Sequence, residues 1–326
     1  MNNNSIYSSE LSDLLEGFIA EKRSLGYKYQ KEEIIMRQFD SYWKAHGYNE
    51  KNLTIENLSE WTTKKDTEGA INLKRRIATT RQFAIYLNGI GIVSYIPSEK
   101  IHCETKVRRP LSPQEITELF EAVDNYNPVH NCTLANKRIA KEYPVLFRLL
   151  YLNGLRVSEA CKLPIDQLNL EEGTIIILDS KGNKDRLVYL ADDMIDLLRE
   201  YIAFLSFTLN ETPKWLFPGE QPYKPLHKGS VEHRFNESWN MTSFAKGSLE
   251  KPVVHDLRHT FVVDRINKWM LQGLDFEYML PYLSKYLGHK TFDETYYYYH
   301  YTEEAAKAIK TKDSTIKKVI PEVMRR

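Results

Sequence analysis

Cysteine is scarce in this sequence: Cys103, Cys132 and Cys161 are the only three among 326 residues, and none belongs to a CxxC pair. An odd number of widely spaced cysteines argues against a disulfide framework or a zinc site and favours reduced thiols. No apolar run approaches the ~18 residues that a membrane span needs, and the start, MNNNSIYSSE, lacks the basic and then apolar pattern of a secretion signal. We therefore expect a soluble cytoplasmic protein without a membrane partner.

An excess of charge of one sign is also missing. The net charge of +1 argues weakly against a nucleic-acid partner, because phosphate binding needs clustered Lys and Arg. The distribution is uneven, since residues 1–110 hold 17 basic and 14 acidic residues (+3) and the remainder 28 and 30 (−2). The stretch LKRRIATTRQFAIYL (73–87) contains four candidate DNA contacts: Lys74, Arg75, Arg76 and Arg81. An ordinary solvated helix face is the alternative for this stretch.

Apolar residues recur at helical spacing in the first third of the chain. The pattern predicts helices over 10–46 with a break at SLGYKY, around 54–65, and over 71–88. Residues 96–112 are polar, hold a proline near each end and show no periodicity, which is typical of a linker. We therefore expect an all-helical domain with its linker over residues 1–107 and a second domain over 108–326.

The second domain is predicted to be mainly helical with a small antiparallel β element. It opens on a capping box, with Ser112 before the helix, Pro113 at its first position and Glu115 at its third. Two short strands, 173–178 and 187–190, are expected to flank a turn at the hairpin DSKGNKDR. The rest is predicted to be helical, with a loop-rich stretch at 211–230. The expected fold class is mostly α, in two domains.

Six polar side chains of the second domain have the chemistry to handle a phosphodiester. They are Arg156, Lys181, His255, Arg258, His289 and Tyr298. Arg156 follows a turn near a helix start, while His255 and Arg258, three residues apart, project from one helical face. Taken singly, each is a common surface or packing residue, and the run TYYYYHY is by default amphipathic packing. Their order along the chain carries the argument.

That order, with the motifs around it, resembles the tyrosine recombinase (phage integrase) family. NGLRVSEACKL, SKGNKDRLVYL, HDLRHTF and YLGHKTFDETYYYYH are each similar to a motif of the family. In the last motif the nucleophile stands nine positions after one His and two before another, and only Tyr298 stands so between His289 and His300. The first domain is similar to the SAM-like core-binding domain of the family, and the resemblance covers residues 10 to 303.

The resemblance implies how the scissile phosphate would be held. Arg156 and Arg258 would grip its non-bridging oxygens and neutralise the charge that grows in the transition state. His255 and His289 would add hydrogen bonds or help to move a proton. Because rejoining uses the energy of the bond that cleavage conserves, we expect no cofactor, neither ATP nor a metal ion.

The resemblance also implies the roles of the reacting groups. Tyr298 would attack and form a 3′-phosphotyrosine bond, and Lys181, at the tip of the predicted hairpin, would protonate the departing 5′ oxygen. Lys184 and Arg186 are interpreted as contacts to the DNA backbone, with Lys184 as the fallback for Lys181. Glu159, one helical turn after Arg156, is expected to orient that arginine.

Partners follow from the same resemblance. The family implies double-stranded DNA with specific recombination sites, a free monomer that forms a homotetramer on DNA, and accessory DNA-bending proteins. The segment between Arg258 and His289 is long and ends on the motif LPYLSKYLGH. In this it resembles the branch of the family that is found on bacterial transposons and other mobile elements, so we expect a role in integration, excision or transposition. The loop around 211–250 is also longer than is typical, and the tail after residue 302 is expected to dock on a neighbouring protomer.

Two alternative functions stay open at this stage. The same tyrosine chemistry would serve a type IB topoisomerase-like or resolvase activity. A non-cleaving site-specific DNA-binding protein is the second alternative, although such a protein would have no need for the six candidate positions together.

Overall fold

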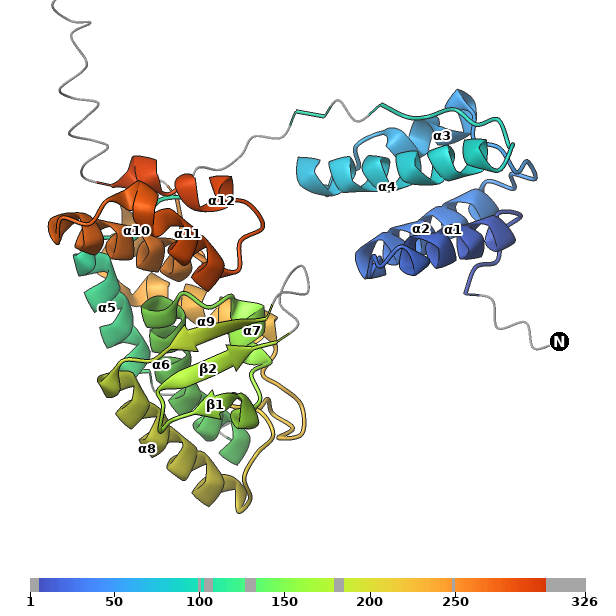
Figure 1. The fold of residues 1–326 in the computed structure, drawn as a ribbon. Helices are drawn as coiled ribbons and strands as arrows, with labels where there is room; N and C mark the ends of the chain where they lie inside the picture. The colour runs from blue at the N-terminus through green and yellow to red at the C-terminus, as the bar shows by residue number, and fades with distance from the viewer. Residues whose placement is uncertain are drawn as a thin grey trace, which may run out of the picture. The chain divides into compact units, whose positions relative to one another are not determined.

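The computed structural model describes residues 6–98, 101–102, 108–126, 133–178, 185–247 and 250–302. The chain divides into two compact units, Met1–Lys106 and Val107–Arg326 (Figure 1). Helices dominate both units, and the second unit carries a small antiparallel sheet, which confirms the predicted fold class. No helix in these ranges is long and apolar enough to cross a membrane.

Four helices make up the described part of the first unit. They are α1 (Ser12–Ser24), α2 (Gln30–Ala45), α3 (Ile55–Thr62) and α4 (Ala70–Gly89). The predicted break at SLGYKY is confirmed, because Gly26 takes a φ of 85° just after α1. Each helix contributes an aromatic residue to the core. The ring of Phe39 lies 5.0 Å from that of Trp61 and 6.2 Å from that of Phe83, and Phe83 in turn lies 5.4 Å from Phe18.

The basic residues of α4 do not share one environment. Lys74 and Arg75 are exposed, whereas Arg76 is buried. The guanidinium of Arg76 forms an ion pair with Glu68 and donates hydrogen bonds to two carbonyls at the end of α3. The expectation that Arg76 contacts DNA is therefore wrong, because this side chain holds the α3–α4 connection together. Arg81 is half-buried and donates a hydrogen bond to the carbonyl of Pro97.

The second unit begins with the helix that the capping box predicts. Ser112 Oγ accepts from the backbone N–H of Glu115, and Glu115 accepts from the backbone N–H of Ser112, so the prediction is confirmed. The helices of this unit are α5 (Pro113–Asp124), α6 (Leu134–Asn153), α7 (Val157–Cys161), α8 (Asp192–Leu209), α9 (Lys228–Met241), α10 (Asp256–Leu271), α11 (Phe276–Leu287) and α12 (Asp293–Tyr296), with 3₁₀ turns η1 (Ile165–Gln167), η2 (Ser243–Lys246) and η3 (Tyr299–Tyr301). The stretch 211–250, expected as an expanded loop, holds α9 and η2.

Three strands form the sheet, in the order β1 (Leu168–Asn169), β2 (Thr174–Ile177) and β3 (Arg186–Tyr189), all antiparallel. The two predicted strands, β2 and β3, are confirmed. The strand β1 was not predicted, because two residues are too few to show an alternating pattern. Side chains alternate between faces along a strand. This alternation turns Arg186 and Val188 inward and leaves Leu187 and Tyr189 exposed, so Arg186 points away from solvent.

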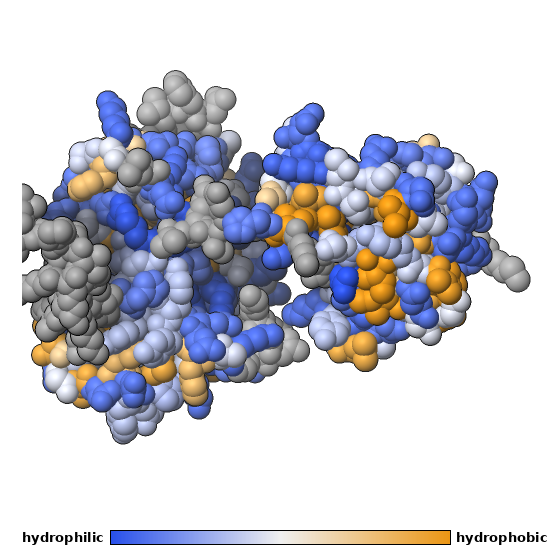
Figure 2. Space-filling view, turned by 90° about the horizontal axis from the view of Figure 1, so that it is seen from above, coloured by the Kyte–Doolittle hydropathy of each residue, from blue (hydrophilic) through white to orange (hydrophobic). Residues whose placement is uncertain are grey.

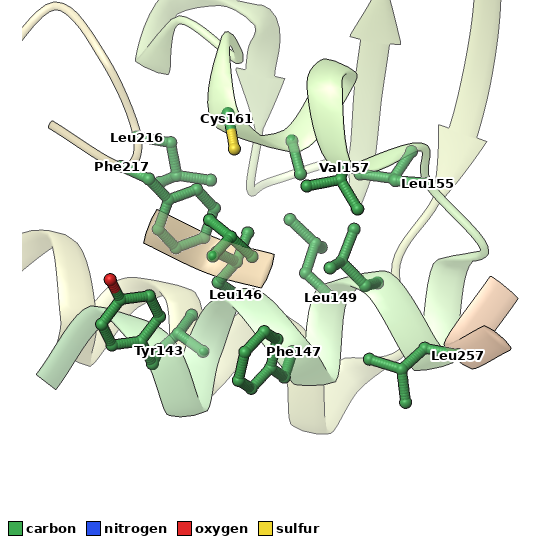
Figure 3. Packing of buried hydrophobic residues seen from close by; sticks show 14 of the residues in the cluster. Tyr143, Leu146, Phe147, Leu149, Leu155, Val157, Cys161, Leu216, Phe217 and Leu257 are labelled. Carbon is green, nitrogen blue, oxygen red and sulfur yellow. The ribbon is translucent and has the colours of Figure 1, made fainter. Parts of the chain in front are cut away.

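The core of the second unit is built around α6. Leu146 and Leu149 on one face of this helix point toward Val157 of α7 and toward Phe217 (Figure 3). All four are buried, and Leu146, Leu149 and Phe217 are fully so. α6 ends at Asn153, where Gly154 takes the left-handed conformation, and α7 begins at Val157.

We predict that Gly154→Ala destabilises the second unit by about 1–3 kcal/mol. Gly154 has a φ of 61°, and a Cβ there would lie 2.4 Å from Cδ1 of Phe261, so the variant combines backbone strain with a steric clash. Urea unfolding measures the loss. Gly247→Ala is the matched control, since Gly247 has a negative φ and no described atom within 4 Å of the added Cβ. Equal midpoints for the two variants would contradict the prediction.

Candidate active site

Arg156 is held by a carboxylate and a carbonyl. It is the N-cap of α7, and Glu159 accepts both its backbone N–H and its Nη1, each at 2.8 Å. Nη2 of Arg156 donates to the carbonyl of Gly288 at 3.1 Å. The prediction that Glu159 orients Arg156 is confirmed by these contacts.

Glu159 also binds a second arginine. Both of its oxygens accept from Arg186, at 3.0 and 2.7 Å. Although burial opposes ionisation, the hydrogen bonds from Arg186 and Arg156 lower the pKa of Glu159 to about 2. Arg186, expected as a DNA-backbone contact, is 7% exposed, and that expectation is wrong because its guanidinium is committed to Glu159. Lys181 and Lys184 lie outside the described residues.

Arg258 is the most deeply buried cation of the site, 2% exposed. Its Nη1 donates to the carbonyl of Gly154 at 2.5 Å and its Nη2 to the carbonyl of Leu287 at 2.7 Å. Burial lowers the pKa of Arg258 to about 10, so the group stays charged at neutral pH. Arg156 and Arg258 therefore bind consecutive carbonyls, those of Gly288 and Leu287, and this turn brings the two guanidiniums together.

The turn itself follows from local sequence. α11 ends at Leu287, and Gly288, with a φ of 64°, reverses the chain so that the backbone N–H of His289 donates to the carbonyl of Ser284. Glycine adopts this left-handed conformation without strain, which is why it so often ends a helix. A Cβ at position 288 would lie 3.3 Å from Cδ of Arg186. The predicted helix end that presents His289 is confirmed.

Three imidazoles line the same region. His255 precedes α10 and is exposed on one side, His259 follows one turn later with its ring 5.0 Å away, and His289 is buried. Desolvation, reinforced by the positive charge of Arg258, lowers the pKa of His255 and of His259 to about 4, and that of His289 to about 3. All three rings are therefore neutral near pH 7. His259 was missed in the sequence, although its spacing of four from His255 places both on one helical face.

Tyr298 is buried among these groups, 5% exposed. Its ring lies 5.2 Å from that of His259 and stacks parallel to that of His289, with 6.4 Å between centroids. Burial raises the pKa of Tyr298, while the nearby charge of Arg258 lowers it in part. Among the described residues no hydrogen bond engages its hydroxyl, so the phenol is available for chemistry.

The other tyrosines of the run have packing partners. Tyr296 and Tyr299 lie 5.9 and 4.9 Å from the ring of Phe276, at the start of α11. The hydroxyls of Tyr297 and Tyr301 lie 3.2 Å apart. Tyr301 ends the η3 turn, and its ring lies 5.8 Å from that of Tyr297.

The site is suited to an anion. Two guanidiniums converge beside a phenol and three neutral imidazoles, and no group of three or more His, Cys, Asp or Glu side chains that could hold a metal ion occurs in the described ranges. Guanidinium groups match the geometry of phosphate oxygens. The arrangement can bind a phosphate and present a nucleophile to it.

A model of the phage integrase family matches residues 109–305, more than half of the chain, and the chain therefore belongs to this family. A putative integrase/recombinase, y4rB, of Sinorhizobium fredii is 25% identical and covers 89% of this chain and 92% of its own length. Tyrosine recombinase XerD of Rhizobium meliloti is 27% identical, with 89% and 90% covered. A tyrosine recombinase of Pseudothermotoga lettingae is 29% identical, with 77% and 76% covered.

Solved structures share the fold. XerH site-specific recombinase bound to palindromic difH substrate, in a post-cleavage complex, superposes with a TM-score of 0.60 at 19% identity and covers 86% of this chain and 78% of that one. The Tn1549 transposon integrase in complex with a circular intermediate DNA gives a TM-score of 0.60 at 15% identity, with 92% and 99% covered.

We predict that the second unit loses stability as the pH falls from 6.5 to 5. Desolvation lowers the pKa of the buried His289 to about 3 in the folded protein, against about 6.5 in the unfolded chain, so only the unfolded chain takes up a proton at this ring in this window. For His289 alone the loss reaches about 2 kcal/mol at pH 5. Urea unfolding at pH 7.5, 6 and 5 measures it. His289→Gln should show a smaller pH dependence, and an unchanged slope would refute the assignment to this ring.

Proposed function

We propose that this protein is a site-specific DNA recombinase that cleaves and rejoins DNA strands, with Tyr298 as its nucleophile. The observation that carries the proposal is the convergence of Arg156 and Arg258 on the Leu287–Gly288 turn, in the same buried site as the phenol of Tyr298. Membership of the phage integrase family supports it independently.

In the proposed reaction, Arg156 and Arg258 bind the non-bridging oxygens of one phosphodiester. A guanidinium has five N–H groups, and the hydrogen bonds of Arg258 to Gly154, Leu287 and His289 use three of them, which leaves two donors for a phosphate. His255, exposed on one side, and His289 lie beside the same phosphate. Positive groups that are already in place stabilise the extra charge of the transition state without reorganisation.

The covalent step exchanges one ester for another. The oxygen of Tyr298 bonds to phosphorus, the bond to the 5′ oxygen breaks, and a 3′-phosphotyrosine remains. The phenol loses its proton to solvent or an imidazole, and the departing 5′ oxygen gains one, from Lys181 by resemblance to the family. Because the ester is conserved, attack by a 5′ hydroxyl reverses the step without ATP or a metal ion.

We assign DNA binding to both units: residues 1–107 as the core-binding domain and 108–326 as the catalytic domain with its tail. Lys74 and Arg75 are exposed on α4 and are the proposed backbone contacts of the first unit. Arg81 is a weaker candidate for a DNA contact, because its guanidinium already donates a hydrogen bond to the carbonyl of Pro97.

Recombination between two sites needs four protomers, and we propose that the protein assembles as a homotetramer on DNA, with accessory DNA-bending proteins, in the cytoplasm. The first unit exposes large apolar side chains, among them Leu25, Ile34 and Ile71, and apolar patches are visible on its surface at the right of Figure 2. Such patches are typical of protein interaction sites. The likeness to a transposon integrase supports a role in the integration, excision or transposition of a mobile element.

We expect wild-type protein to form a covalent adduct with nicked suicide duplexes tiled across the DNA that flanks the gene, in the presence of EDTA. Tyr298→Phe should form none, because the attacking oxygen is absent. Denaturing electrophoresis of labelled DNA detects the adduct. Tyr301→Phe and Tyr297→Phe are matched controls that remove a neighbouring phenol and should retain cleavage. An adduct from Tyr298→Phe would show that another residue is the nucleophile.

Arg75→Ala should weaken DNA binding by about tenfold at 0.15 M salt and reduce the salt dependence of the affinity by about one phosphate contact. Fluorescence anisotropy of the duplex captured by the wild-type protein measures both. Arg199→Ala removes the same charge from an exposed position on α8 of the second unit. Equal losses of affinity in the two variants would argue against a specific contact at Arg75.

A further inference from the structure

One buried hydroxyl links the nucleophile segment to the imidazole of His289. Oγ1 of Thr295 lies 2.7 Å from Nδ1 of His289, and Thr295 is completely buried. The carbonyl of the same residue accepts the backbone N–H of Tyr298 at 3.1 Å. Thr295 therefore contacts His289 through its side chain and Tyr298 through its main chain.

The other ring nitrogen of His289 shows which tautomer is present. Nε2 lies 3.2 Å from Nη2 of Arg258, which carries only donors, so Nε2 must accept and be unprotonated. The neutral ring then holds its proton on Nδ1 and donates it to Oγ1 of Thr295. Both ring nitrogens are satisfied, and the orientation of the ring is defined from two sides.

We propose that Thr295 is a positioning residue for recombination: its hydroxyl, bound to Nδ1 of His289, keeps the Nε2 edge of that ring turned toward Arg258 and the scissile phosphate. The proposal rests on the proposed function and goes beyond the family motif, which implies roles for His289 and Tyr298 only. Because α12 carries both Thr295 and the approach to Tyr298, the imidazole and the nucleophile are set by one short element.

A hydroxyl suits this role because it both donates and accepts. In the free protein it accepts from Nδ1. When a phosphate oxygen faces Nε2, that nitrogen needs the proton in order to bond, and the hydroxyl of Thr295 can then donate to Nδ1. One proton leaves Nδ1 and one reaches Nε2 through solvent, so the ring stays neutral and keeps its orientation in both states.

Two substitutions distinguish the effect of the Thr295 hydroxyl from the effect of its side-chain volume. Thr295→Val keeps the shape and removes the hydrogen bond, whereas Thr295→Ser keeps the hydroxyl. With the suicide duplex that the wild-type protein cleaves, Thr295→Val should form the adduct about 10- to 100-fold more slowly, the range found when the hydrogen-bond partner of a metal-bound histidine is removed. Thr295→Ser should stay within about threefold of the wild type, and the DNA affinity of both should be unchanged.

A double-mutant cycle tests whether Thr295 acts through His289. In a His289→Ala background, Thr295→Val should change the cleavage rate less than about twofold, because the group that it positions is gone. If Thr295→Val cleaves at the wild-type rate, or slows cleavage equally with and without His289, the proposal is wrong.

A spectroscopic readout on the full chain without DNA keeps this test independent of recombination. In ¹⁵N-histidine-labelled wild-type protein and in Thr295→Ser, Nδ1 of His289 should carry a downfield, slowly exchanging proton. This signal should be lost in Thr295→Val while the remaining spectrum is retained. Its absence from the wild type, or its persistence in Thr295→Val, overturns the proposal, whereas failure of the wild type to cleave DNA would overturn the proposed function instead.

Discussion

Two consecutive carbonyl groups at the end of α11 organise the whole site. The carbonyl of Leu287 accepts from Arg258 and that of Gly288 from Arg156, so residues 102 positions apart in the chain share one turn. Helix ends leave carbonyls without intrahelical partners, and here two such groups receive guanidiniums. The left-handed Gly288 makes the turn possible, and the capping pair of Arg156 with Glu159 aims one of the cations.

The electrostatic character of the site follows from this arrangement. Three arginines, Arg156, Arg186 and Arg258, surround a single carboxylate, Glu159, and the pocket therefore holds an excess of positive charge. A buried cation without a counter-ion is costly, and the imidazoles avoid adding to it by staying neutral. In the proposed reaction an incoming phosphodiester would supply the missing negative charge, so the excess of positive charge would favour its binding.

The tyrosine run illustrates how packing separates chemically identical groups. Tyr296 and Tyr299 rest on Phe276, and Tyr297 pairs with Tyr301. These contacts fasten the segment to the start of α11, and only Tyr298 enters the buried site, beside His289. The neighbouring rings thereby hold the phenol of Tyr298 in place, which explains why so many aromatic residues follow one another in this segment.

The sequence alone determined the helical pattern, the capping box at Ser112, the two main strands and the set of candidate residues, because periodicity, caps and motif spacing are local properties of a chain. It placed Arg76 and Arg186 on a DNA-facing surface, and it missed His259 and Thr295. Tertiary structure decided these four, since burial and partners depend on what packs against a side chain. Glu68 binds Arg76 and Glu159 binds Arg186, and the fold brings His259 beside Tyr298 and Thr295 beside His289. The order of residues along the chain indicates which side chains have suitable chemistry, but only the folded structure decides which of them lie in the site.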